Sequence, residues 1–324
     1  MSPALEERPF GKTGERVTVL GLGGGYLDKY SLADGVATVR RALEAGINYF
    51  DTSPSYGRGA SQVILGKALE GYKEPYMLAT KLGYLGTPSA FRSPDALRAQ
   101  LWENLRALRR SKVDVLQVHE ADWHCWWSDE AQHEELVRPN YSYDFDDAAI
   151  MEVLREAKAQ GLCRFIGITG NNAEELSTVL RCVDVDSCLV AYNHNLLFRR
   201  AQQTVLPLAQ KKGVAYVAAG ILFGGSFTRV HPEWLVAPPL WVAPEVRGRL
   251  ARLYGLQKAS GLSLVNMSVR YLVGDSAIST ILVGAASPVE LEECVAAAQQ
   301  GPLPPDLHQS IEELGVELEL QDFL

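Results

Sequence analysis

Short apolar runs alternate with longer segments of helical periodicity along most of the chain. A run at 19–23 is followed by a segment at 34–45 in which apolar residues recur every three or four positions. Nearly continuous apolar runs are typical of strands buried on both faces, and the periodic segments are typical of the helices that cover them. The pattern predicts strands at 19–23, 48–51, 76–81, 113–119, 164–169, 187–192, 214–219 and 280–283.

Eight strands that alternate with helices predict a closed (β/α)8 TIM barrel, since this number of repeats favours closure over an open doubly wound sheet. A β-hairpin is expected ahead of the first strand, at 8–18, where Gly11 and Gly14 supply a turn. An extra C-terminal helix is expected at 303–318. No linker or break in composition divides the chain, so we expect a single barrel domain over residues 1–324.

Composition and charge narrow the class of protein. The 324 residues are 47% hydrophobic and 22% charged, which gives ample material for one large core. A net charge of −8 argues against a nucleic-acid partner, because affinity for phosphate backbones comes from Lys and Arg. No apolar run approaches the ~20 residues of a membrane-spanning helix, so we expect no membrane partner. The 5 cysteines have neither disulfide nor zinc spacing, which predicts reduced thiols, a cytoplasmic location and no bound metal.

Four polar residues fall at or just beyond the C-terminal ends of consecutive predicted strands. Asp51, Lys81 and His119 each end a strand, and Tyr56 lies on the turn that follows Asp51. The chemistry of an α/β barrel lies at this end of its strands, so we expect the four side chains to meet. A phenol has an ordinary pKa near ~10 and becomes a usable acid or base when a nearby cation favours the phenolate. The sequence therefore predicts a proton-transfer site centred on Tyr56.

The segments that carry these residues resemble the signatures of the aldo-keto reductase family. They read Gly-Ile-Asn-Tyr-Phe-Asp-Thr-Ser-Pro-Ser-Tyr-Gly at 46–57, Ala-Thr-Lys at 79–81 and Asp-Val-Leu-Gln-Val-His at 114–119. Three motifs in order and at the family's spacing are specific, whereas any one alone is weak. The segments at 116–120 and 164–170 look most similar to the aldose dehydrogenase members, such as those for L-galactose and L-fucose.

The resemblance implies a role for each of the four residues. Tyr56 would act as the general acid in carbonyl reduction and as the general base in alcohol oxidation. Lys81, paired with Asp51, would lower the pKa of the tyrosine, and His119 would orient the substrate oxygen. The hydride would come from a nicotinamide cofactor, because no side chain carries one. The alternative is that the four are ordinary polar groups at strand ends.

The segment after the eighth predicted strand bears on the choice between NAD and NADP. Family members that prefer NADP carry Lys or Arg there for the 2′-phosphate, whereas the matching positions here are Gly284, Ala286, Ser287 and Glu290. A carboxylate repels a phosphate and accepts hydrogen bonds from a free ribose hydroxyl, so we expect NAD rather than NADP. The alternative for Glu290 is a solvated residue in the first turn of a helix. The resemblance gives these candidate cofactor contacts: Thr169, Asn193, Leu222, Gly224, Gly225, Gly284, Glu290 and Glu293.

A long segment without clear periodicity, 121–147, follows His119 and is rich in aromatic residues. Trp123, Trp126 and Trp127 offer flat apolar faces with a polar edge, which suits stacking on a sugar ring or closing a substrate pocket. Tyr26, after the first strand, is a further candidate for the pocket wall. The alternative is that the tryptophans anchor the segment to the barrel rim or to a subunit interface of a homo-oligomer.

Together these features predict an NAD(P)-dependent oxidoreductase that interconverts a carbonyl and an alcohol. The dehydrogenase-like segments and the aromatic loop favour a sugar or another hydroxyl-rich small molecule as the substrate. The residues do not set the direction of the reaction, because the same tyrosine serves both directions. The alternative from another class is a nucleotide-binding regulatory or scaffolding subunit with little turnover.

Overall fold

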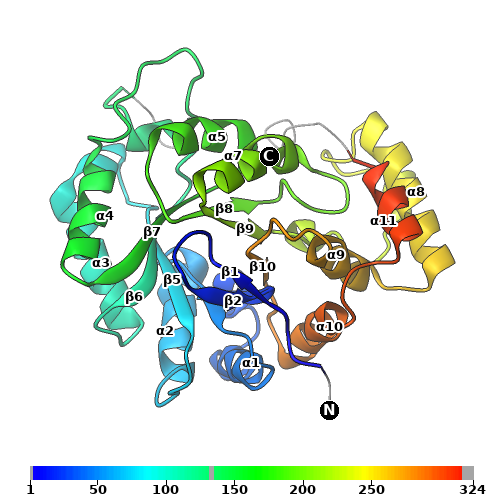
Figure 1. Ribbon diagram of the computed structural model, residues 1–324. Coiled ribbons are helices and arrows are strands. Elements are labelled where there is room, and N and C mark those ends of the chain that lie inside the picture. The colour runs from blue at the N-terminus through cyan, green and yellow to red at the C-terminus, as the bar shows by residue number, and fades with distance from the viewer. Residues whose placement is uncertain (1–2, 131–134, 316–324) are drawn as a thin grey trace.

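Eight parallel strands form a closed barrel in the computed structural model, which describes residues 3–130 and 135–315. The strands pair in the order β10-β3-β4-β5-β6-β7-β8-β9, and β10 also pairs with β9, which closes the ring. Figure 1 shows the helices arranged around the outside of this ring. The predicted (β/α)8 fold is therefore confirmed.

The barrel strands are buried almost throughout, because one face points into the barrel and the other lies against the helices. This explains why the sequence shows nearly continuous apolar runs rather than strict alternation. The strands are β3 (Leu20–Gly23), β4 (Tyr49–Asp51), β5 (Met77–Leu82), β6 (Val113–Val118), β7 (Cys163–Gly170), β8 (Ser187–Ala191), β9 (Ala215–Ala219) and β10 (Thr280–Val283).

The outer helices begin where the sequence offers capping residues. Ser93 accepts a hydrogen bond from the amide of Ala96 at the start of α3, and Ser287 accepts one from the amide of Glu290 at the start of α10. The helices are α1 (Leu32–Glu44), α2 (Ala60–Ala68), α3 (Pro94–Ala107), α4 (Ala149–Ala159), α5 (Ala173–Cys182), α6 (Arg200–Gln203), α7 (Val205–Lys212), α8 (Pro244–Ser260), α9 (Leu264–Val273), α10 (Pro288–Gln299) and α11 (Pro305–Glu312).

Two helices differ from the sequence pattern. The sequence at 201–212 predicts one helix, but the structure divides it into α6 and α7 at Thr204, because Pro207 lacks the amide hydrogen that a continuous helix needs there. The extra C-terminal helix is present as α11, which ends at Glu312. Residues 316–318 of the predicted helix lie outside the described residues.

A hairpin lies across the N-terminal end of the barrel, as predicted. Strand β1 (Glu7–Pro9) pairs antiparallel with β2 (Arg16–Thr18), and Figure 1 shows the pair in front of the barrel strands. Phe10 is fully buried, and its ring centroid lies 5.5 Å from that of Tyr49 inside the barrel. The hairpin thus closes one end of the barrel, and the C-terminal ends of the strands lie at the other.

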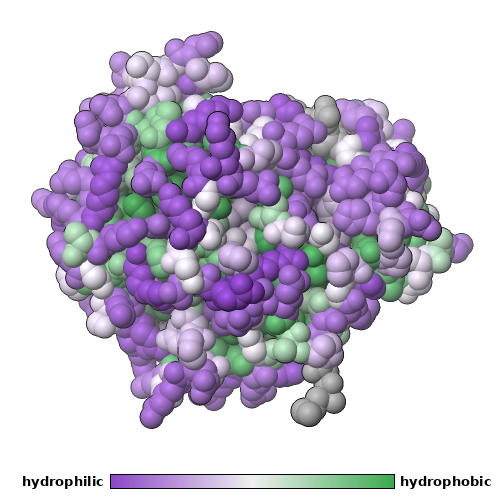
Figure 2. Space-filling view, in the orientation of Figure 1, coloured by the Kyte–Doolittle hydropathy of each residue, from purple (hydrophilic) through white to green (hydrophobic). Residues whose placement is uncertain are grey.

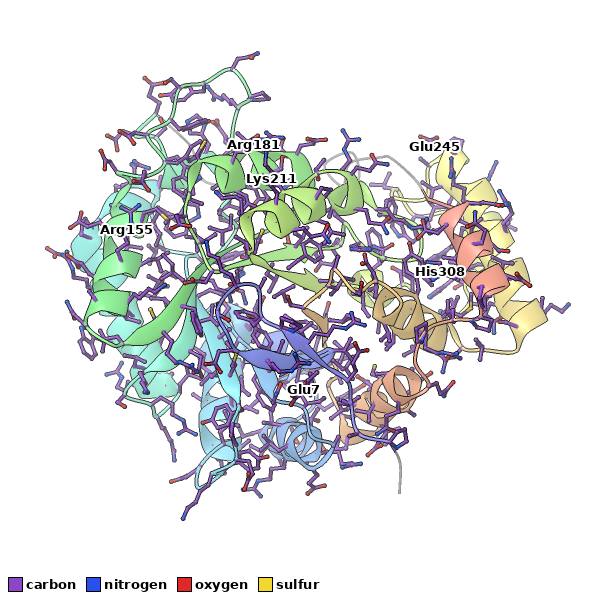
Figure 3. All side chains as sticks on the ribbon, viewed as in Figure 1. Glu7, Arg155, Arg181, Lys211, Glu245 and His308 are labelled. Carbon is purple, nitrogen blue, oxygen red and sulfur yellow. The ribbon has the colours of Figure 1, made fainter. Side chains whose placement is uncertain are left out.

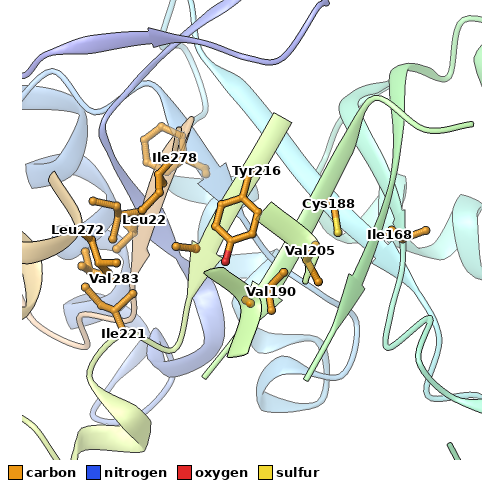
Figure 4. Packing of buried hydrophobic residues seen from close by; sticks show 14 of the residues in the cluster. Leu22, Ile168, Cys188, Val190, Val205, Tyr216, Ile221, Leu272, Ile278 and Val283 are labelled. Atoms are coloured by element: carbon orange, nitrogen blue, oxygen red, sulfur yellow. The ribbon is translucent and has the colours of Figure 1, made fainter. Parts of the chain in front are cut away.

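The main apolar core fills the layer between the barrel and the helices. Figure 4 shows Tyr216 and Cys188 on barrel strands near Val205 of α7, with Leu272 of α9 further along. The surface in the view of Figure 2 is mainly hydrophilic, with apolar residues in small patches. Figure 3 shows charged side chains such as Arg155 on α4. Within 3–130 and 135–315, no helix has the length and apolar character needed to cross a membrane.

Candidate active site

Neighbouring strands bring the predicted catalytic residues to one rim of the barrel. Asp51 pairs with Ala79 across β4 and β5, and Lys81 pairs with Gln117 across β5 and β6. His119 directly follows β6, and its backbone amide donates a 2.9 Å hydrogen bond to the Leu82 carbonyl. The groups therefore meet because three consecutive parallel strands end at the same edge.

Asp51 and Lys81 form a buried ion pair beneath Tyr56. The Lys81 ammonium donates to Asp51 Oδ1 and also to the Thr52 carbonyl at 3.0 Å, while Gln117 Nε2 donates to Asp51 Oδ2 at 2.8 Å. Asp51 and Lys81 are 2% and 1% exposed. Burial lowers the pKa of Lys81, and the nearby Asp51 carboxylate opposes that shift. The pair is held by several hydrogen bonds, as a buried pair of charges requires.

Tyr56 begins a short turn, Tyr56–Gly59, in which Gly57 and Arg58 have left-handed backbone conformations, and it lies above this ion pair. The Lys81 Nζ is 4.8 Å from the centroid of the tyrosine ring. The His119 ring meets the same ring edge to face, with 5.6 Å between the centroids. The structure thus brings Asp51, Lys81, His119 and Tyr56 together, as the sequence predicts.

The pKa of Tyr56 differs from the expectation. Burial, with the negative charge of Asp51, raises the pKa of the phenol well above its ordinary value, whereas the resemblance implies that Lys81 lowers it. Burial is the largest cause of this rise, ahead of the charge of Asp51. Tyr56 therefore keeps its proton at neutral pH, and the expected role of Lys81 in lowering its pKa stays a prediction.

His119 is oriented by a residue that the sequence reasoning missed. Its Nδ1 lies 2.9 Å from the Ser53 hydroxyl, which leaves Nε2 as the ring nitrogen for a substrate. Burial and the charge of Lys81 hold the pKa of His119 well below its usual range, so the imidazole is neutral at neutral pH. The only sequence signal for Ser53 was its place within the segment at 46–57.

Unusual backbone conformations gather at this rim. Six non-glycine residues within 3–130 and 135–315 have positive φ, and five of them follow barrel strands. Such conformations cost about 1–3 kcal/mol each and cluster at functional sites. The five are Arg58, Tyr84, Glu120, Tyr192 and Phe223.

The candidate cofactor residues on strands β7, β8 and β9 also lie at this rim. Thr169 is the second-to-last residue of β7, and its hydroxyl accepts a 3.1 Å hydrogen bond from the Glu120 amide. Asn193 uses both hydrogens of its amide group on backbone carbonyls, so only its carbonyl oxygen can serve a ligand as an acceptor. Gly224 and Gly225 have φ of 61° and 95°, with open space where a side chain would lie. Leu222 precedes them after β9.

The other candidates for cofactor contact lie around the start of α10. A β-carbon at Gly284 would lie 2.7 Å from the ring of Tyr26, so a residue with a side chain there would require that ring to shift. The Glu290 carboxylate accepts hydrogen bonds from the Ala286 amide at 2.9 Å and from the Tyr30 hydroxyl at 3.1 Å. It is therefore fixed beside the loop rather than only solvated. Glu293 instead accepts a 2.7 Å hydrogen bond from the Ser263 hydroxyl at the start of α9.

The structure favours the anchoring alternative for two of the three tryptophans. Trp126 is 1% exposed, and its indole N–H lies 3.0 Å from the His119 carbonyl. Trp127 donates to the Ala121 carbonyl at 2.7 Å. These bonds tie the segment at 121–147 to the rim. Trp123 lies nearer the site, since its ring is 5.2 Å from that of Tyr84, which packs on His119.

Comparisons with known proteins identify the family of this chain. A model described as the Aldo/keto reductase family matches residues 19–316. L-galactose dehydrogenase of Arabidopsis thaliana is 30% identical over 306 residues, which cover 91% of this chain and 89% of that protein. Pyridoxal 4-dehydrogenase of Microbacterium luteolum is 27% identical over 340 residues, which cover 92% and 94%. The holo form of an aldo-keto reductase from Bacillus halodurans matches with a TM-score of 0.75 and 23% identity, over 97% of each chain.

Proposed function

The chain belongs to the aldo/keto reductase family, and from that premise we propose that it is an NAD-preferring oxidoreductase of sugars or similar hydroxyl-rich molecules. Family membership makes it an NAD(P)-dependent oxidoreductase; the acid–base residue, the preferred cofactor and the substrate are what we add. The observation that carries the proposal is the contact of Tyr56 with His119 above the Lys81–Asp51 ion pair.

Tyr56 acts as the acid–base group in this proposal. A bound nicotinamide supplies the hydride in reduction or takes it up in oxidation. In reduction, Tyr56 gives its phenolic proton to the carbonyl oxygen, so that the carbonyl becomes an alcohol. In oxidation, Tyr56 takes the hydroxyl proton back. His119, fixed through Nδ1 by Ser53, directs Nε2 toward the same oxygen and so aligns it with the phenol.

Polar groups and open space at the rim support the binding of a dinucleotide. Thr169 offers a hydroxyl and Asn193 offers an amide oxygen, and no atom lies within 4 Å of the position that a β-carbon would take at Gly224 or Gly225. A carboxamide has both a donor and an acceptor, and these groups complement it. They are the residues that would hold the cofactor, together with Leu222 and Gly284.

The position of Glu290 supports a preference for NAD. Two hydrogen bonds fix its carboxylate beside the loop that follows β10, at the start of α10. A fixed carboxylate there accepts hydrogen bonds from a ribose hydroxyl and repels the extra phosphate of NADP. Comparing kcat/KM with NAD and with NADP tests this directly. A clear preference for NADP would refute it.

Titration of the protein with NAD(H) and NADP(H), followed by a panel of aldoses, pyridoxal and simple aldehydes, tests the function as a whole. Turnover of aldoses supports the proposal; tight nucleotide binding without any turnover favours the scaffolding alternative. Tyr56→Phe removes only the phenolic hydroxyl and should lower kcat by about 10²–10⁴-fold with unchanged cofactor affinity. Retained activity in this variant would remove Tyr56 from the acid–base role.

The sugar class of substrate is supported by likeness and by chemistry. L-galactose dehydrogenase, as its name says, acts on an aldose, and it shares 30% identity with this chain. A cytoplasmic location stays a prediction, supported by five free cysteines. A single domain over 1–324 and a homo-oligomeric assembly likewise remain predictions, and size-exclusion chromatography with light scattering measures the assembly.

A further inference from the structure

A chain of hydrogen bonds crosses the rim from the loop after β6 to the loop after β8. It begins at Asp122, a fully buried residue, and ends at Asn193, one of the candidate cofactor contacts. Between the two lies the peptide group that joins Asn171 to Asn172, directly after β7. The chemistry proposed above does not use Asp122.

The peptide group between Asn171 and Asn172 is held from both sides. Its N–H, which belongs to Asn172, donates to Asp122 Oδ2 at 2.8 Å. Its C=O, which belongs to Asn171, accepts from Asn193 Nδ2 at 2.5 Å. Because a trans peptide group is planar, its N–H and C=O point in opposite directions, and fixing one fixes the other. The Asp122 carboxylate therefore sets the direction of the carbonyl that Asn193 meets.

That carbonyl in turn sets which end of the Asn193 side-chain amide is left for a ligand. Asn193 Nδ2 donates to the Asn171 carbonyl and also to the Ala191 carbonyl, at 2.9 Å. Only the nitrogen end of the amide can serve two acceptors, since its oxygen carries no hydrogen. Both hydrogens are used in this way, so Asn193 presents Oδ1, an acceptor.

Hydrogen bonds between neighbouring strands place Asn193 at the edge that carries His119. The two residues that follow His119 are both tied to Thr169 at the end of β7. The Glu120 amide donates to the Thr169 hydroxyl at 3.1 Å, and the Ala121 amide donates to the Thr169 carbonyl at 2.7 Å. The loop after β7 then reaches Asn193 through the bond described above.

Thr169 and Asn193 together match the two ends of a carboxamide. The Thr169 hydroxyl accepts from a backbone amide and so keeps its own hydrogen to donate to a carbonyl oxygen. Asn193 Oδ1 is an acceptor for an amino group. If the Asn193 amide were turned over, it would set a donor against that amino group, and an unpaired polar group costs binding energy.

We propose that Asp122 is a positioning residue for the cofactor: through the peptide group between Asn171 and Asn172, it keeps Asn193 Oδ1 turned toward the amino group of the nicotinamide carboxamide. This deepens the proposed function and rests on it for the contact between Asn193 and the cofactor. Asp122 acts only through Asn193 and touches no reacting atom. The site therefore selects dinucleotides whose carboxamide has its amino group.

The alternative is that Asp122 only caps the start of α5. Asp122→Ala removes the acceptor for the backbone amides of Asn171 and Asn172, whereas Asp122→Asn keeps an acceptor and is the conservative variant. Asp122→Ser, whose side chain is shorter, replaces Asp122→Ala if that variant does not fold. Asn193→Leu removes the acceptor at the other end of the chain of hydrogen bonds. Asp147→Ala, at an exposed position, is the matched control.

The test compares NAD with 3-acetylpyridine adenine dinucleotide, in which a methyl group replaces the amino group of the carboxamide. Dissociation constants are measured by tryptophan fluorescence, so the result depends neither on turnover nor on the sugar. Asp122→Ala should weaken NAD binding about three- to tenfold, as expected for one lost hydrogen bond, and leave binding of the acetyl analogue unchanged. Asn193→Leu should do the same. Asp122→Asn and Asp147→Ala should keep the wild-type preference for NAD.

The outcomes separate the positioning role from a cap and from the proposed function. The double variant Asp122→Ala with Asn193→Leu should lose no more of the preference than either single variant, because both act on one contact. Equal weakening of the two dinucleotides in Asp122→Ala, or an unchanged preference, overturns the role of Asp122. A wild-type protein that binds both dinucleotides equally instead refutes the contact of Asn193 with the carboxamide, which belongs to the proposed function.

Discussion

Asp122 is a fully buried carboxylate whose removal should change how stability depends on pH. It follows strand β6 and binds the start of α5. Its Oδ2 accepts hydrogen bonds from the Asn171 amide at 3.0 Å, the Asn172 amide at 2.8 Å and Asn172 Nδ2 at 2.8 Å. Its Oδ1 has no hydrogen-bond partner within 3–130 and 135–315. Asp122→Asn keeps an acceptor for the three donors and removes the buried charge.

Burial raises the pKa of Asp122 from 3.8 to about 6, against the opposing hydrogen bonds from Asn172 and Asn171. A raised pKa means that the folded protein holds a proton between these two values which the unfolded chain has lost. This contribution to stability is complete below pH ~4 and is lost as pH rises through ~6. A rise of roughly two in the pKa of Asp122 corresponds to ~3 kcal/mol of unfolding free energy. Of this, ~2 kcal/mol is lost between pH 4.5 and pH 8.

Urea unfolding followed by tryptophan fluorescence at pH 4.5 and pH 8 measures this difference. Relative to the wild type, Asp122→Asn should gain about 2 kcal/mol in unfolding free energy between the two pH values. Asp147→Asn, at an exposed position in the same loop, controls for loss of a carboxylate and should show no such gain. If Asp122→Asn follows the wild type at both pH values, Asp122 does not carry the buried charge inferred here.

Two further predictions concern the site itself. Ser53→Ala removes the partner of His119 Nδ1, so kcat should fall about tenfold while KM changes less, because the ring loses its orientation. Steady-state kinetics measures this, and an equal rise in KM alone would contradict it. Gly284→Ala places a methyl group 2.7 Å from the Tyr26 ring, so dinucleotide affinity should weaken about tenfold in a fluorescence titration. The double variant Gly284→Ala with Tyr26→Ala should regain the dinucleotide affinity. If it does not, the contact with Tyr26 is not the cause of the weaker binding.

Most of the fold and the meeting of the candidate catalytic groups could be predicted because both depend on patterns that are local in sequence. Each strand is a short apolar run, and parallel strands that end at one rim bring their following residues together. Asp51 and Lys81 meet for this reason, as strand register alone places β4 beside β5. The division of α6 from α7 needed only attention to Pro207.

Side-chain partners between distant segments could not be predicted in this way. Ser53 and His119 are 66 residues apart, and nothing in their spacing indicates that the hydroxyl meets Nδ1. The roles of the tryptophans at 121–147 could not be predicted from the sequence either. The density of aromatic residues indicated that the segment has a function. The sequence does not distinguish a tryptophan whose indole stacks on a sugar from one whose indole donates to a backbone carbonyl. Only the hydrogen bond of Trp126 to the His119 carbonyl distinguishes them.

The raised pKa of Tyr56 separates the two directions of the reaction. In the protein alone, burial and the nearby carboxylates keep the phenol protonated, which suits it to act as an acid in reduction. To act as a base in oxidation it must first lose that proton, so the raised pKa favours oxidation only at higher pH.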